Sequence, residues 1–187
     1  KVLEFIGPGV SNLSMDYRFG IDVMTTESAC LSSVWRTDRH VRDFLEIHGR
    51  SGEYAELNPS EGACYDGAIV VELDKIEPMI ALPFHPSNCY TIREFKENME
   101  DILAAVDEDA AKLLNLKSPV ESLRSKIRDG RFVVDQAFVG GCSGGLYQNI
   151  IRMAEILGGS SIGSDGFSLS VYPASQPMMI KLTETAP

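Results

Sequence analysis

Apolar and polar positions follow one another along the first fifty residues in a pattern that predicts a strand and a helix, twice over. Strong β formers make up each expected strand, and a glycine–proline turn stops the first one. Each expected helix has a polar residue that can cap its amino end, with apolar residues behind it at a period of about 3.6. In chain order the elements are a strand at 2–6, a helix from Ser14, a strand at 29–35, and a helix from Thr37 or Asp38 to Gly49.

The rest of the chain returns to this alternation after a polar and proline-rich interruption. The expected elements are a loop at 50–67, a buried strand at 68–73, an extended, irregular stretch punctuated by prolines at 76–90, a charged helical region at 92–127 broken near Ser118 and Pro119, a strand at 132–139, an amphipathic helix at 147–157, a loop at 158–166 and a strand at 167–172. Strands that alternate with helices are typical of α/β folds. We expect a domain boundary near 120–130.

The composition is that of a folded, acidic protein. The 187 residues are 44% hydrophobic, which is enough to bury a core, and no apolar run is long enough to span a bilayer. A formal net charge of −10 disfavours binding to nucleic acid or to an anionic membrane, because such surfaces need clustered Lys and Arg. We expect a cytoplasmic protein whose partners include neither nucleic acid nor membrane.

The four cysteines, at positions 30, 64, 89 and 142, are widely and irregularly spaced. No Cys-x-x-Cys pair or histidine-rich segment accompanies them, which argues against a zinc finger or a redox dithiol and favours reduced thiols. The chain begins with Lys and ends in a sequence that could start a helix, so we expect it to be a segment of a longer protein.

The glycine-rich turn around Cys142 is the strongest local sign of chemistry. Residues 135–145 read Asp-Gln-Ala-Phe-Val-Gly-Gly-Cys-Ser-Gly-Gly and lie between an expected strand and an expected helix. Glycines let the backbone adopt positive φ and approach a bulky group, and the amino end of a following helix favours a thiolate. This geometry suits a metal or cluster ligand. The competing interpretation is a small buried hydrophobic residue, which is the commoner role of a free cysteine.

Four stretches together resemble the iron–sulfur hydro-lyases of the aconitase and isopropylmalate dehydratase family. They are a glycine turn and helix at 4–18 continued by Ile21, Met24 and Glu27, an aromatic-to-acid turn at 35–38 followed by Phe44 and Leu45, a strand and proline-rich loop at 65–66, 71–74 and 78–88, and the turn at 135–145. Their order and spacing agree with the family over nearly the whole chain.

The resemblance implies a three-layer α/β/α fold similar to the aconitase iron–sulfur domain. We expect one such domain at residues 1–125 and the start of the following α/β domain at 126–187. Cys142 falls at the family's first cluster cysteine, and the other two, spaced Cys-x-x-Cys, would follow 172–175 outside this chain. Three cysteines hold a 4Fe-4S cluster in this family. We therefore expect the cluster in the intact protein and not in this segment alone.

The resemblance also implies a reaction and a second site residue. The intact protein is expected to be a hydro-lyase that adds or removes water on a small polycarboxylate, with the open iron of the cluster as a Lewis acid. Glu27 falls at the family's glutamate beside cluster and substrate. Apart from the resemblance, Glu27 reads as a solvated or capping residue. The remaining catalytic groups are expected on other domains of the parent protein, and this segment alone is expected to be inactive.

Two departures from the family pattern keep other interpretations open. The family has Asn at the position of Val23 and Thr-Asn after the cysteine, where this chain has Ser143 and Gly144. Neither the valine side chain nor glycine can form the hydrogen bonds of an amide. These positions indicate a divergent branch with a different substrate or with lost chemistry. One alternative is a non-catalytic aconitase-like binding or regulatory module, and another is a structural α/β domain with an incidental cysteine.

Overall fold

The computed structural model describes residues 1–114, 121–164 and 166–185, which form two compact units. Unit 1 consists of Lys1–Ile69 and Gln136–Pro187, and unit 2 is Val70–Asp135, so unit 2 is an insertion in the sequence of unit 1. The expected boundary at residue 125 concerns the domains of a longer protein and stays a prediction.

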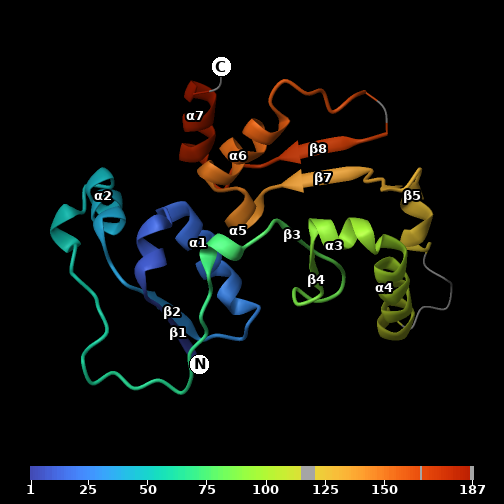
Figure 1. Cartoon of the computed structure of the whole chain (residues 1–187). Coiled ribbons are helices and arrows are strands. Elements are labelled where there is room, and N and C mark those ends of the chain that lie inside the picture. The colour runs from blue at the N-terminus through green and yellow to red at the C-terminus, as the bar shows by residue number, and fades with distance from the viewer. Residues whose placement is uncertain (115–120, 165, 186–187) are drawn as a thin grey trace. The chain divides into compact units, whose positions relative to one another are not determined.

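Unit 1 begins with a parallel strand pair joined through a helix. Strand β1 (Val2–Phe5) pairs with β2 (Ser32–Trp35) in the register Val2 to Ser32, and α1 (Met15–Val23) lies between them in the chain (Figure 1). The rings of Phe5 and Trp35 stack at the end of the pair, with centroids 4.1 Å apart. Short 3-10 helices at Pro8–Asn12 and Met24–Thr26 precede and follow α1.

Side-chain caps fix where the first two α-helices begin. The Ser14 hydroxyl accepts a hydrogen bond from the amide of Tyr17, as expected for the N-cap of α1. Asp38, and not Thr37, caps α2 (Arg39–Ile47), because its carboxylate accepts from two amides of the first turn. Gly49 lies just beyond α2 with φ of 68°, in the left-handed region that favours glycine. The cap predicted for α1 is confirmed, and of the two residues predicted as the cap of α2 the structure selects Asp38.

A second parallel pair completes unit 1. Strand β7 (Gln136–Val139) pairs with β8 (Ser168–Val171), and between them lie the single-turn helix α5 (Gly141–Gly144) and α6 (Tyr147–Leu157). The bounds predicted for α6 are confirmed. Helix α7 (Gln176–Thr185) follows β8. Helix α1 contacts both α5 and α6, so the two halves of the unit meet at α1.

Unit 2 carries its own hydrophobic core. Strands β3 (Met79–Ala81) and β4 (Cys89–Thr91) are antiparallel, and so are β5 (Ile127–Arg128) and β6 (Arg131–Phe132). Helices α3 (Ile92–Glu97) and α4 (Met99–Leu114) supply most of the buried side chains. The core residues are Leu82, Phe95, Met99, Ile102, Leu103 and Val106. The break expected near Ser118 and Pro119 lies outside the described residues.

Three expectations about strands are wrong. Residues 68–72 form no strand, and Ile69 and Val70 are 86% and 87% exposed, because no described strand pairs with this apolar run. The stretch at 76–90 is not irregular throughout, since it contains β3 and β4. The single strand expected at 132–139 is divided, because Phe132 pairs with β5 and residues 136–139 pair with β8.

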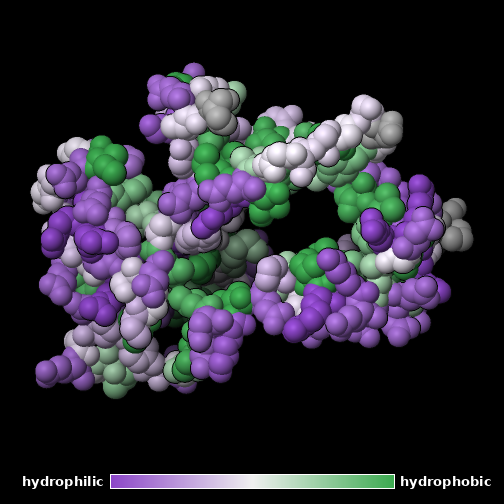
Figure 2. All heavy atoms as spheres, turned by 45° about the horizontal axis from the view of Figure 1, so that its top comes forward, coloured by the Kyte–Doolittle hydropathy of each residue, from purple (hydrophilic) through white to green (hydrophobic). Residues whose placement is uncertain are grey.

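The mixture of helices with parallel strand pairs confirms the α/β class. Hydrophobic side chains are also visible on the surface of the molecule in Figure 2, consistent with the exposed run at 69–71. Within the described residues, none of the helices combines the length and the apolar character that crossing a membrane requires.

Candidate functional site

The turn that carries Cys142 follows directly from strand β7. Gly140 is extended and Gly141 has φ of 80°, so the chain reverses sharply before the single turn of α5. The Cys142 side chain is exposed and forms no disulfide. The thiol thus lies just beyond the carboxyl end of a parallel strand, which is where open α/β sheets bind ligands. The expectation of a presented thiol is confirmed, and the alternative of a buried small hydrophobic residue is wrong.

Gly145 allows the end of this turn to pack closely against the chain after β8. A Cβ at this position would lie 2.7 Å from the Gly141 carbonyl oxygen and 2.8 Å from that of Tyr172. The Gly145 carbonyl accepts a hydrogen bond from the amide of Ala174, with nitrogen and oxygen 2.9 Å apart. The segment at 172–174 therefore runs beside the Cys142 turn, and only glycine fits at position 145.

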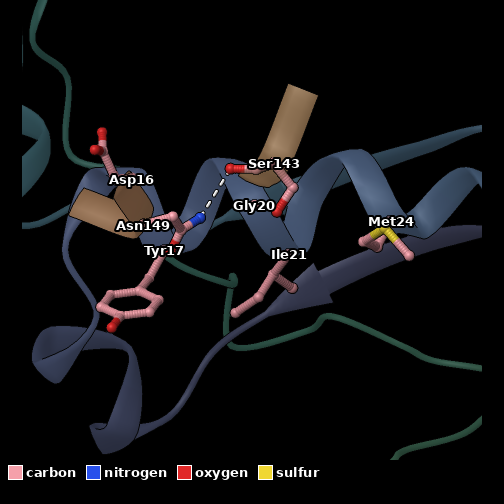
Figure 3. Close-up of a pocket in the computed structure, with 7 residues that line it drawn as sticks. All are labelled: Asp16, Tyr17, Gly20, Ile21, Met24, Ser143 and Asn149. Carbon is pink, nitrogen blue, oxygen red and sulfur yellow. Dashed lines mark hydrogen bonds between the residues drawn. The ribbon is translucent and has the colours of Figure 1, made fainter. Parts of the chain in front are cut away.

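Asn149 of helix α6 contacts the same turn. The side-chain amide of Asn149 donates a partly buried hydrogen bond to the carbonyl oxygen of Ser143, 2.8 Å away (Figure 3). Both residues border a cavity of about 350 Å³. The other residues that line the cavity are Asp16, Tyr17, Gly20 and Ile21 of α1 and Met24, the first residue of the 3-10 turn that follows it.

Helix α1 is bonded to α6 at one point and approaches the Cys142 turn at another. At its first turn, the Asp16 carboxylate accepts from the Gln148 amide at 3.0 Å, and the Ser14 hydroxyl donates to the Gln148 side chain at 2.5 Å. At its middle, a Cβ added to Gly20 would lie 3.0 Å from the Ser143 hydroxyl oxygen, which is very close for non-bonded atoms. Gly20 thus lets α1 approach the residue that follows Cys142.

Glu27 lies at the far end of the same helical segment. It is the C-cap of the 3-10 turn that follows α1, and its side chain is exposed. The Thr26 hydroxyl lies within hydrogen-bond distance of the Glu27 carboxylate, at 2.8 Å, and of the Val23 carbonyl oxygen, at 2.9 Å, and donates its one proton to either of them. Glu27 is thus a solvent-facing residue at the end of a helical segment, and the helix that leads to it also contacts the Cys142 turn.

An ion pair between α1 and α2 anchors the other side of the helix. The Arg18 side chain is 2% exposed, and its Nη2 donates to the Asp38 carboxylate at 2.5 Å and to the Val10 carbonyl oxygen at 2.9 Å. Burial alone would raise the pKa of the Asp38 carboxyl, but the hydrogen bond and charge of Arg18, helped by the Val41 and His40 amides, hold that pKa below its ordinary value. Asp38 therefore both caps α2 and neutralises Arg18.

Val23 and Gly144, the two residues that depart from the family pattern, differ in their surroundings. Val23 is the half-buried last residue of α1. Gly144 is the last residue of α5, and a Cβ added there would meet no atom within 4 Å. Crowding at the Cβ position therefore does not explain the glycine at position 144.

The donor set fits one ligand of an iron–sulfur cluster. An exposed thiol among glycines is suitable, because cluster iron is held by cysteine thiolates and the turn leaves room for a bulky group. Within residues 1–114, 121–164 and 166–185, no three His, Cys, Asp or Glu side chains gather as a metal site. Neither Cys142 nor Glu27 lines the cavity described above. Further ligands would have to come from outside this chain.

Sequence reasoning predicts Cys142 as a site residue but missed the residues that surround its turn. Gly20 and Asp16 act through contacts between segments more than 120 residues apart, which no local pattern reveals, whereas Asn149 bonds to Ser143, six residues before it. One signal was available for Gly20, since a glycine inside a helix has a propensity cost that usually has a packing reason.

Known proteins provide a consistent set of relatives. The model of the aconitase family (aconitate hydratase) matches residues 1–186. The 3-isopropylmalate dehydratase large subunit of Campylobacter curvus is 31% identical over 180 residues, which cover 96% of this chain and 35% of that protein. The 2,3-dimethylmalate dehydratase large subunit of Eubacterium barkeri is 26% identical over 184 residues, which cover 98% and 36%. The chain thus spans about a third of the length of these relatives.

Proposed function

Because this chain belongs to the aconitase family, we propose that the protein containing it is a hydro-lyase that adds or removes water on a small polycarboxylate. The match over residues 1–186 is the observation that carries the proposal. Two relatives are named as dehydratases, which supports the reaction class. Their names also contain substituted malates, each a dicarboxylate with a hydroxyl group, which supports the substrate class.

Cys142 is proposed as one thiolate ligand of a 4Fe-4S cluster in the intact protein. The exposed thiol, the positive φ of Gly141 and the closely packed Gly145 support this role. A bound cluster supplies Lewis-acid chemistry toward hydroxyl and carboxylate oxygens. This chain's part is to present the thiol in one fixed turn, with the remaining cysteines supplied from outside it.

Glu27 is proposed as the carboxylate that handles the proton of the departing or entering water. A hydrogen bond donated by the Thr26 hydroxyl can orient the carboxylate at the end of the α1 segment. A carboxylate in such a place can accept a hydrogen bond from a substrate hydroxyl or a water and act as a general acid or base. The substrate carboxylates need cations, and none lines the cavity beside α1, so those groups are expected on the rest of the protein.

Other parts of the protein are proposed as partners of this chain. Both relatives are named as large subunits, which supports further domains or subunits for the intact protein. The four cysteines are free, as is usual in a reducing compartment, which supports a cytoplasmic location.

The test is iron and sulfide analysis of the intact protein purified without oxygen, with assays of water loss from substituted malates. We expect about four irons and four sulfides per chain. Cys142→Ser should lose iron and activity, whereas the control Cys64→Ser, at another exposed cysteine, should keep both. Glu27→Gln should keep iron but lose activity about a hundredfold or more. A well-folded protein without iron would contradict the proposal.

A non-catalytic binding module is the second candidate, and the residues at Val23 and Gly144 favour it. Because a Cβ at position 144 meets no atom within 4 Å, Gly144→Asn is a suitable way to restore the family residue. If the protein has lost chemistry, Gly144→Asn combined with Val23→Asn should raise iron retention and dehydratase activity. If the protein is an active enzyme for another substrate, the double variant should leave iron retention unchanged and alter substrate preference.

A further inference from the structure

We propose that Asn149 is a positioning residue for Cys142 and fixes the peptide that follows the thiol. The proposal rests on the proposed cluster-ligand role of Cys142 and adds a residue that no sequence motif assigned. The contact that carries it is the hydrogen bond from the Asn149 amide to the Ser143 carbonyl oxygen at 2.8 Å.

The Ser143 carbonyl is the point where the single turn of α5 is joined by a side chain of α6. Helix α5 is too short to satisfy its own last carbonyl groups, so these need partners from elsewhere. The Ser143 carbonyl oxygen accepts from the backbone amides of Gly145 and of Leu146, the latter at 3.1 Å, and has a second kind of bond from the Asn149 side chain at 2.8 Å. The side-chain bond comes from the following helix, so it ties the orientation of the Cys142 turn to the axis of α6.

The surrounding contacts leave this peptide few other positions. Gly145 packs against Tyr172 on one side, and Gly20 of α1 approaches the Ser143 hydroxyl on the other. The neighbouring residue Gln148 is bound to Asp16 and Ser14 of α1. Asn149 is the only side chain among the described residues whose hydrogen bond reaches the backbone between Cys142 and Gly145. Removing it should free the turn without removing the thiol.

Amide hydrogen exchange and iron loss to a chelator, both on the intact protein, test the proposal. Exchange is followed at Gly145 and Leu146, whose amides bond within the turn, in protein stripped of iron. Asn149→Ala should speed this exchange about fivefold, the effect of one lost hydrogen bond. Asn149→Asp keeps the shape of the side chain, and a carboxylate is favourable at the amino end of a helix, so α6 should stay folded. An ionised carboxylate cannot donate a hydrogen bond to the Ser143 carbonyl, so this variant should show the same faster exchange as Asn149→Ala.

The matched control is Asn58→Ala, which removes an exposed amide bond to Glu56 at 2.8 Å and touches no part of α5. In iron-loaded protein both Asn149 variants should lose iron to the chelator faster than the wild type and the control do. Unchanged amide exchange would overturn the proposal, and so would faster exchange with unchanged iron loss. If the wild type holds no iron, the proposed function fails, and the exchange data alone decide whether Asn149 holds the turn.

Discussion

At the scale of single residues, the Arg18–Asp38 pair is the most buried ion pair of the described residues, and we predict that it dominates the stability of the α1–α2 contact. The two side chains are 2% and 19% exposed. Asp38→Asn keeps an N-cap residue for α2 but leaves the Arg18 charge without its partner. Loss of one partner of a buried pair costs about 3 kcal/mol. Urea denaturation at pH 7 should show this loss in the free energy of unfolding.

The pH dependence of the stability of Asp38→Asn shows whether the loss comes from the charge of the Asp38 carboxylate or from the shape of its side chain. The pKa of Asp38 is lowered in the folded protein, so its stabilisation is present above the ordinary value of 3.8 and is lost as the pH falls through the lower folded value. The difference between wild type and Asp38→Asn should therefore be constant from pH 7 to pH 5 and shrink below 3.8. Asp43→Asn, an exposed carboxylate on the same helix, should show no such difference. A gap that persists in acid would contradict the ion-pair explanation.

At the scale of elements, the contact of α1 with α5 depends on the absence of a side chain at Gly20. Alanine in a helix interior is favoured over glycine by about 1 kcal/mol, so Gly20→Ala should stabilise the protein if nothing opposes it. The Ser143 hydroxyl, 3.0 Å from the added Cβ, does oppose it. We expect the full gain only when Ser143→Ala removes that oxygen, and a smaller gain or a loss in the wild-type background.

A double-mutant cycle measured by thermal or urea denaturation checks this prediction. The two substitutions should be non-additive, because each changes an atom of the same contact. Gly52→Ala is a suitable control, since a Cβ there meets no atom within 4 Å, and it should be additive with Ser143→Ala. Additivity of Gly20→Ala with Ser143→Ala would show that α1 does not rest on the Cys142 turn at this point.

Elements whose signals are local were predictable, and those that depend on a partner were not. The β1 strand, the Asp38 cap and the 147–157 helix follow from residues within one element, and the structure confirms them. The run at 68–73 has the composition of a buried strand but no strand beside it, so it stays exposed. The same limit applies to the site. Glycines next to Cys142 indicated a presented thiol, whereas the contacts that Gly20 and Asp16 of α1 make with Ser143 and Gln148 join segments more than 120 residues apart.

At the scale of the whole molecule, the chain exposes apolar surface that a folded protein usually covers. Ile69, Val70 and Val71 are 86%, 87% and 60% exposed and adjoin one another in sequence. The relatives are almost three times as long as this chain, which matches 35% of one and 36% of the other. Contiguous exposed apolar residues favour association, because association removes them from water.

We therefore predict that the 187-residue chain self-associates and that Val70→Lys shifts it toward the monomer. The substitution puts a charge in the middle of the apolar run. It also changes the net charge from −10 to −9, which weakens repulsion between copies, so a shift toward monomer cannot arise from net charge. Ser60→Lys, which adds the same charge at an exposed polar position, should leave the association unchanged. Sedimentation velocity over a range of concentrations measures both variants. Equal behaviour of the two would show that the run at 69–71 does not drive association.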